Sequence, residues 1–170
     1  MKKTFVAFAA VAALSIVTNI AFASDIDKSG FTVLAGMNVS FDDVSQEYDQ
    51  AVGFTVAGDW TFNNGIILGA SFSPKFINDS IQDMTTSADM YTVYSGYQLD
   101  NGVRLKGGVS ITASELSISK IGSADDSHIN LLVGGGYEFD NNIVIDANLA
   151  STEVFARNGF TLQLLAGYKF

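Results

Sequence analysis

The chain has 170 residues and a formal net charge of −9, from 18 acidic and nine basic side chains, and this acidic balance argues against nucleic acid as a partner. It contains no cysteine and one proline but 16 glycines and 12% aromatic residues, which is typical of β structure without disulfides. After the first 23 residues, no stretch reaches the roughly 18 consecutive apolar residues that a membrane helix requires.

The first residues predict a cleaved signal peptide. Lys2 and Lys3 give a basic start, an apolar run follows, and Ala21-Phe22-Ala23 has the small-x-small form that signal peptidase cuts. An uncleaved membrane anchor is the alternative, but the apolar run is short for one. We therefore expect residues 1–23 to be removed and residues 24–170 to form a barrel domain with seven basic residues against 18 acidic ones.

The rest of the chain contains eight stretches in which apolar residues alternate with small or polar ones. A period of two sustained over eight segments predicts eight β-strands with one apolar face. The stretches cover residues 31–41, 52–62, 66–72, 91–99, 103–111, 129–139, 143–149 and 160–170.

The links between these stretches alternate between tight turns and longer connections. The tight turns are rich in Asn and Gly, which tolerate the positive φ of short hairpins: Asn63-Asn64-Gly65, Asp100-Asn101-Gly102 and Asp140-Asn141-Asn142. The longer links, expected to be loops at the opposite end, are residues 42–50, 74–88, 114–127 and 151–158. The pattern predicts an all-β fold, an eight-stranded antiparallel up-and-down β-barrel.

The apolar face could point inward, as in a soluble lipocalin-like barrel, or outward, as in a transmembrane one. Residues 52–62 span about 34 Å, and a tilt of about 40° leaves a height of about 26 Å, close to the apolar band of outer-membrane barrels. Aromatic residues cluster near strand ends on the apolar face, as in membrane-interface girdles. The other face is mostly Gly, Ser, Thr and Asn, which suits a narrow lumen. We therefore predict a transmembrane barrel.

A few charges fall on the inward phase, all near a tight turn or the C-terminus: Asp59, Arg104, Lys106, Glu138, Asp146 and Lys169. They should gather at the periplasmic end of the lumen as a neutral set. Because buried charges need partners, we predict that they pair into a salt-bridged plug. The alternative is a few solvated charges at a wet barrel mouth.

The remaining charges lie mainly in the longer links, which are strongly acidic. Asp42-Asp43 and Asp125-Asp126 offer oxygen ligands of the kind that Ca²⁺ uses, but neither has the spacing of a calcium loop, so solvated loops are the preferred interpretation. Ser127 and His128 are adjacent and should face opposite sides of a strand, which disfavours a Ser/His catalytic pair. We predict no enzymatic activity, catalytic residue, cofactor or metal.

The end of the chain, Leu162-x-Leu164-x-Ala166-x-Tyr168-Lys169-Phe170, resembles the C-terminal strand of OmpA/OmpX-type eight-stranded outer-membrane barrels. The Gly-Tyr-x-aromatic or Gly-Tyr-x-Leu pieces that begin at Gly96, Gly136 and Gly167 resemble repeats of the same family. The resemblance covers the chain from Gly30 onward. It implies that Leu164, Ala166, Tyr168 and Phe170 form the signal read by the barrel-assembly machinery.

The same resemblance implies a monomer in the outer membrane, surrounded by lipid and lipopolysaccharide. The role that it implies is structural or interactive at the cell surface, with a host or surface ligand held by the acidic loops. The loops are modest in length, so the long projecting hairpins of adhesive members are not assured. Two other hypotheses are a narrow porin-like channel for small solutes and a lipid A-modifying enzyme.

Overall fold

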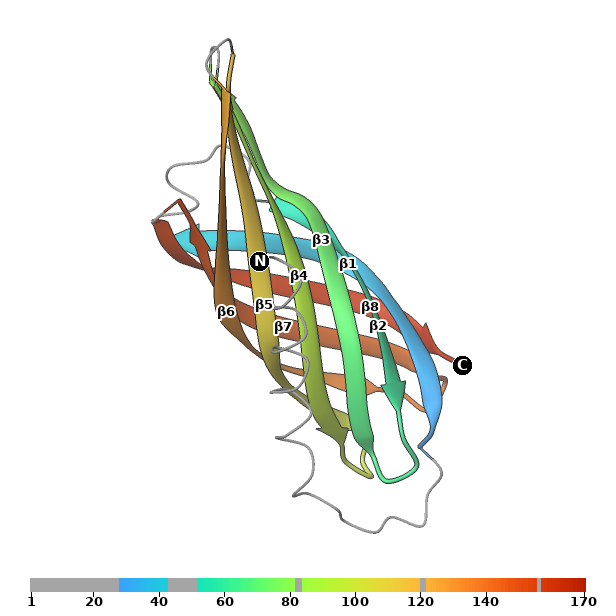
Figure 1. Cartoon of the computed structure of the whole chain (residues 1–170). Coiled ribbons are helices and arrows are strands. Elements are labelled where there is room, and N and C mark those ends of the chain that lie inside the picture. Colours follow the sequence, from blue (N-terminus) through green and yellow to red (C-terminus); the bar gives the residue numbers. More distant parts are fainter. Residues whose placement is uncertain (1–27, 43–51, 82–83, 120–121, 156) are drawn as a thin grey trace.

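The computed structural model describes residues 28–42, 52–81, 84–119, 122–155 and 157–170 and forms one closed antiparallel barrel (Figure 1). Each strand pairs with the next, and β1 pairs with β8, for example Thr32 with Lys169. The prediction of an eight-stranded up-and-down barrel is confirmed. The strands are β1 (Gly30–Asp42), β2 (Val52–Thr61), β3 (Ile66–Ile81), β4 (Met84–Gln98), β5 (Val103–Ile118), β6 (Gly122–Glu138), β7 (Ile143–Val154) and β8 (Arg157–Lys169).

The three tight turns share one construction, which fixes the hairpin register at one end of the barrel. In each turn an Asn side chain accepts a hydrogen bond from the backbone N–H two residues later, as Asn64 does from Ile66 at 3.2 Å. A residue with positive φ follows that Asn, and these residues are Gly65, Gly102 and Asn142. The turn chemistry read from the sequence therefore matches the backbone.

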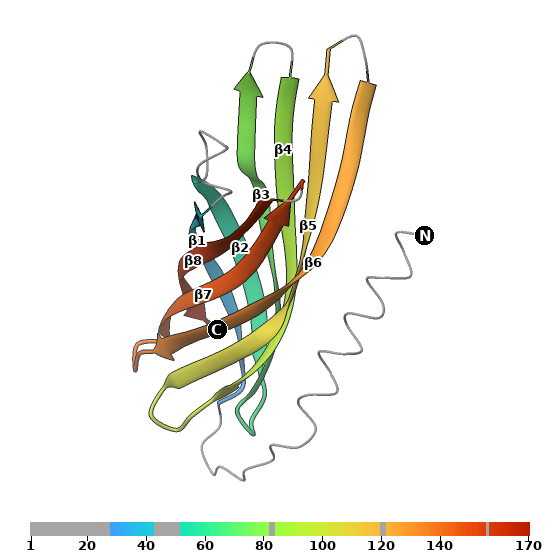
Figure 2. The same cartoon turned by 90° about the vertical axis from the view of Figure 1, so that its left-hand side faces the viewer.

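Three of the four expected loops are instead mostly paired strand, and in residues 151–158 β7 and β8 stay paired up to Val154 opposite Arg157. β3 and β4 remain hydrogen-bonded up to Ile81 opposite Met84, and β5 and β6 up to Ile118 opposite Gly122. β4 and β5 stay paired over the same length, so β3 to β6 form a four-stranded sheet that rises beyond the rest of the barrel (Figure 2). We call it the protruding sheet: residues 77–81, 84–89, 113–118 and 122–128.

Hydropathy could not reveal these extensions, because beyond the lipid a strand needs no alternating apolar face. Residues 78–80 read Asn-Asp-Ser and still pair with residues 85–87 through the backbone. A β-bulge also interrupts the pattern: the register shifts between Ser73 and Ile77, and Lys75 has φ of 43°. The bulge follows Pro74, whose missing N–H cannot join the ladder.

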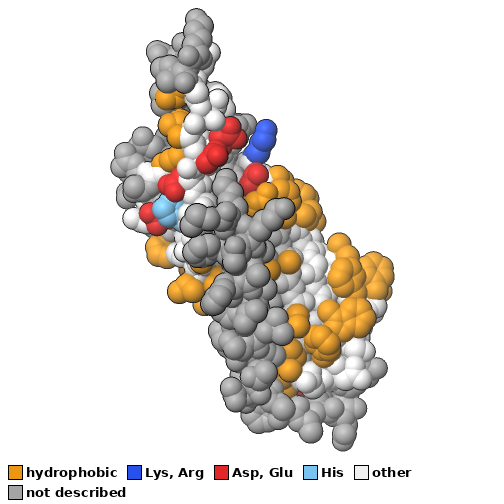
Figure 3. Space-filling model, viewed as in Figure 1, with side chains coloured by type: hydrophobic (Ala, Val, Ile, Leu, Met, Phe, Trp, Pro, Cys, Tyr) orange, Lys and Arg blue, Asp and Glu red, His pale blue; other side chains and the backbone are white. Residues whose placement is uncertain are grey.

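The apolar phase of the strands points outward, as predicted for a membrane barrel. Val56, Leu131 and Leu164 are 42%, 71% and 46% exposed, although each is strongly apolar. Apolar side chains are accordingly frequent on the visible surface of the barrel (Figure 3). Among the described residues, no helix is long and apolar enough to cross a membrane.

Candidate functional site

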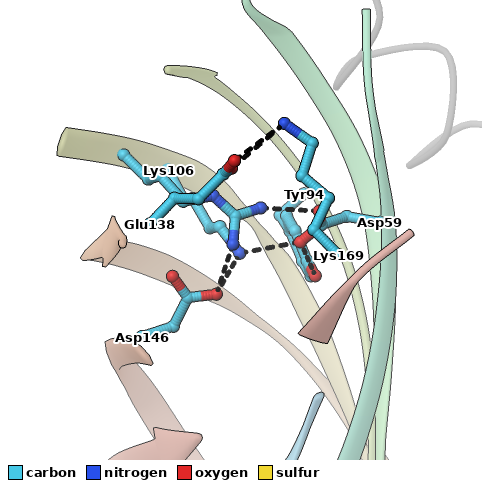
Figure 4. Close-up of polar contacts among 7 residues, drawn as sticks. Asp59, Tyr94, Lys106, Glu138, Asp146 and Lys169 are labelled. Carbon is cyan, nitrogen blue, oxygen red and sulfur yellow. Dashed lines mark hydrogen bonds and ion pairs between the residues drawn. The ribbon is translucent and has the colours of Figure 1, made fainter. Parts of the chain in front are cut away.

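The half of the lumen nearest the tight turns contains a buried ion network that joins β2, β5 and β7 (Figure 4). Arg104 donates from Nη2 to Asp59 Oδ1 at 2.6 Å and from Nη1 to Asp146 Oδ2 at 3.4 Å. Lys106 Nζ donates to Asp59 Oδ2 at 3.0 Å and to Asp146 Oδ2 at 2.5 Å. All four side chains are inaccessible to solvent. Two cations therefore neutralise two carboxylates in a closed arrangement.

Tyr94 on β4 lies against this network on the side away from the tight turns. Its hydroxyl donates to Asp59 Oδ2 at 3.1 Å, and the Lys106 ammonium lies 4.6 Å from the ring centroid. Space for the ring comes from an inward glycine on the neighbouring strand, since a Cβ at Gly69 would lie 2.6 Å from the ring atoms. Tyr94 thus adds a hydrogen bond and a cation–π contact to the ion pairs.

The other two charges proposed for the lumen form a separate pair. Lys169 Nζ lies 3.1 Å from Glu138 Oε2, nearer the mouth. The mouth also holds a cation that strand periodicity could not select, because it precedes the first strand. Lys28 is buried, donates to the Gln98 carbonyl at 3.0 Å and pairs with Asp100 at 2.5 Å.

An apolar layer packs inside the barrel next to Tyr94, toward the end away from the tight turns. Phe76, Ile77, Met90, Leu132 and Val154 are at most 2% exposed and belong to one buried cluster. The sequence analysis described the inward face as mostly small or uncharged polar, and most of these bulky residues were outside the predicted strands. Phe76 was missed because the bulge at Pro74 and Lys75 shifts which residues of β3 point inward.

The end of the barrel opposite the tight turns is acidic. Its carboxylates gather on one face near the single histidine (Figure 3). Arg157 also lies at this end, at the start of β8, but Lys75 is the one basic residue here whose side chain the structure describes, and its backbone N–H donates to Asp89 Oδ1 at 2.8 Å. The described acidic side chains are Asp89, Glu115, Asp125, Asp126 and Glu153. Four others that were expected in loops, Asp43, Glu47, Asp49 and Asp83, lie outside the described residues, as does Lys120.

His128 lies between two of these carboxylates. Its Nε2 is 2.8 Å from Asp126 Oδ2 on the same strand, and its Nδ1 is 3.3 Å from Glu153 Oε2 on β7. The hydrogen bond with His128 lowers the pKa of the Asp126 carboxyl below its usual value, and the Ser127 N–H that Asp126 also accepts acts in the same direction. No group of three or more His, Cys, Asp or Glu side chains in the described part of the chain is arranged to hold a metal ion.

A family model for the outer membrane protein beta-barrel domain matches residues 6–170 of the chain. No curated protein sequence is significantly similar to it. Several solved structures share the fold at low sequence identity. One is Ail, the attachment invasion locus protein of Yersinia pestis, in complex with the heparin analogue sucrose octasulfate. It has 21% identity and a TM-score of 0.62, with 84% of this chain and 99% of that one covered.

Two further solved structures are also similar to this chain. The N-terminal beta-barrel domain of Pseudomonas aeruginosa OprF has 13% identity and a TM-score of 0.56, covering 83% of this chain and 97% of its own. Neisserial surface protein A has 14% identity and a TM-score of 0.50, with 83% of this chain and 95% of that one covered. At these identities the likeness establishes a shared fold.

Proposed function

The chain belongs to the family of outer membrane protein beta-barrel domains, and from this premise we propose that it is a non-enzymatic cell-surface protein with a closed lumen. Its protruding sheet would contact a positively charged partner outside the cell. The observation that carries this proposal is that four strands continue, fully paired, beyond the barrel and bear carboxylates near their ends.

Charge decides which class of partner suits the sheet. The side chains described at this end include five carboxylates and one lysine, and Arg157 at the start of β8 adds a second cation, so the carboxylates still outnumber the cations and their field attracts cations and repels anions. The Ail structure contains a sulfated ligand. Such a polyanion would meet like charge here, and a basic protein or peptide surface would meet opposite charge. The partner proposed for this chain is therefore cationic.

Neutralising the acidic side chains tests this proposal. The protein is placed in uncharged phosphatidylcholine nanodiscs, and binding of a fluorescent oligolysine peptide is followed by polarisation. The triple variant E115Q/D125N/D126N should bind about tenfold more weakly, since each exposed charge contributes up to about 1 kcal/mol. D140N, at the opposite end, should bind like the native protein. Equal binding by the triple variant, or a preference for heparin oligosaccharide, would contradict the proposal.

The lumen favours a structural role over the alternative of a solute channel. The buried ion network and the apolar layer support this, because both place buried side chains in the lumen. Planar-bilayer recordings should therefore show little current. A steady open conductance of the native protein would favour the channel instead.

The remaining proposals concern export and assembly. We expect mature protein to begin at Ser24 after removal of the signal peptide, which N-terminal sequencing would test. Leu164, Ala166, Tyr168 and Phe170 are proposed as the signal for the barrel-assembly machinery. Outer-membrane yield of F170A, compared with an exposed apolar control such as L131A, measures that role.

A further inference from the structure

β6 separates from its neighbour β7 where the protruding sheet begins. Their backbone pairing ends at Leu132 opposite Ala150, whereas β6 continues beside β5 to Gly122. Just above this point the Leu131 N–H donates to Ser151 Oγ at 3.1 Å, a side-chain substitute for a ladder bond. Further out, the His128 side chain on β6 contacts Glu153 on β7.

His128 can hold both of its carboxylate neighbours only when it is protonated. Nε2 faces Asp126 on β6, and Nδ1 faces Glu153 on β7. A neutral imidazole has one N–H and can donate to one of them, whereas an imidazolium donates to both. The His128 side chain is 25% exposed, so it exchanges protons with the outside solution.

We propose that His128 is a pH-dependent clip that fastens β6 of the protruding sheet to β7 in mildly acidic surroundings and releases it as the pH rises. The clip would regulate the surface of the protruding sheet that binds the partner, so this part of the inference rests on the proposed function. Histidine changes charge between about pH 5 and 8, so the clip responds to ordinary changes in the medium.

The clip also sets how many negative charges the sheet offers. Protonated His128 engages Asp126 and Glu153, so both are partly neutralised. A neutral imidazole keeps one N–H, and the shorter contact, 2.8 Å to Asp126 against 3.3 Å to Glu153, favours keeping it on Asp126. Loss of the proton therefore frees Glu153 and increases the attraction for a cationic partner. Binding of such a partner should therefore strengthen as the pH rises through the histidine range.

The other strands next to the clip have few charges in register with it. β5 places Thr112 opposite His128 and Glu115 opposite Asp125. On β8 the nearest charged residue in register is Arg157, which lies opposite Val154.

Spin labels can measure the clip directly, because the chain has no native cysteine. Labels are attached at S123C on β6 and N158C on β8, and double electron–electron resonance gives the distance distribution in nanodiscs at pH 5.5 and 8.0. From pH 5.5 to 8.0 the ratio of the separated to the close population should rise about two- to fivefold, as expected for an exposed ion pair.

Three variants distinguish a titrating clip from a merely structural contact. H128K, which stays charged, should remain close at both pH values. H128Q and E153Q should show the wider distribution at both, while R157Q should keep the native pH response. An unchanged native ratio, or a response that H128Q retains, would overturn the inference. Oligolysine binding is a separate measurement, so its failure would refute the proposed function while the spin-label result still decides the clip.

Discussion

The Lys106 ammonium lies 4.6 Å from the centroid of the Tyr94 ring while also pairing with Asp59 and Asp146. One lysine thus joins the ion network below to the aromatic side chain that covers it. Charged groups at this depth are tolerated because every one has a partner of opposite sign. The lumen is therefore closed by a connected polar unit, and its members should respond to mutation as a unit.

Tyr94→Phe removes the hydroxyl that donates to Asp59 and keeps the ring over Lys106. We expect the free energy of unfolding to fall by about 1 kcal/mol, the usual contribution of one hydrogen bond. Tyr94→Ala also removes the ring and should cost about 3–5 kcal/mol. Urea titration in phospholipid vesicles measures both. Equal losses for the two variants would show that the ring contributes nothing.

Arg104→Met leaves two buried carboxylates with a single cation. The free energy of unfolding should decrease by about 3–5 kcal/mol, because an uncompensated buried charge remains. The double variant R104M/D146N retains the neutral Lys106–Asp59 pair and should recover at least half of that loss. K75Q, which removes an exposed extracellular cation, is the control and should change stability by less than about 1 kcal/mol. A double variant no better than R104M would argue against charge balance as the cause.

The alternating pattern of the sequence was sufficient to predict the barrel, but it predicted the contacts inside the lumen only in part. Alternation fixes the face on which each charge lies, and the tight turns fix the end of the barrel. Which charges pair depends on the stagger between strands: Asp59 meets both Arg104 and Lys106, whereas Glu138 meets Lys169. No periodicity carries that information.

Other features lay outside what periodicity can detect. Lys28 reaches Asp100 from a segment that belongs to no strand. The phase of Phe76 is set by the bulge before it. The outer ends of β3 to β6 are held together by backbone pairing in water, where no apolar face is needed. The alternation of apolar and polar residues therefore stops although the strands continue.

The two layers of the lumen should block ions independently. In planar bilayers, the native protein and R104S/D146S should both pass little current, because the apolar layer of Phe76 and Met90 still excludes water. F76S/M90S should also stay closed, since the ion network remains. Combining all four substitutions should produce a measurable conductance. Current through either double variant would show that one layer alone carries the closure.

The pKa of Asp126 should depend on His128. Because the folded pKa is lowered from the ordinary value of 3.8, the carboxylate contributes stability above that value and loses it as the pH falls through the lowered pKa. Carboxyl ¹³C titration by NMR should show a higher Asp126 pKa in H128Q than in the native protein. A titration curve unaffected by H128Q would assign the lowering to the Ser127 N–H instead.

Lys28 should be protected from trypsin by its contact with the β4–β5 turn. Its side chain is 4% exposed and pairs with Asp100, which is itself 69% exposed. D100N removes the ion pair and leaves the bond to the Gln98 carbonyl, so cleavage after Lys28 should accelerate about two- to fivefold, as for loss of one ion pair. D140N, on the neighbouring tight turn, is the matched control. Because Lys28 precedes β1 yet binds the turn after β4, equal cleavage in D100N and the native protein would mean that this contact does not hold the segment across the mouth.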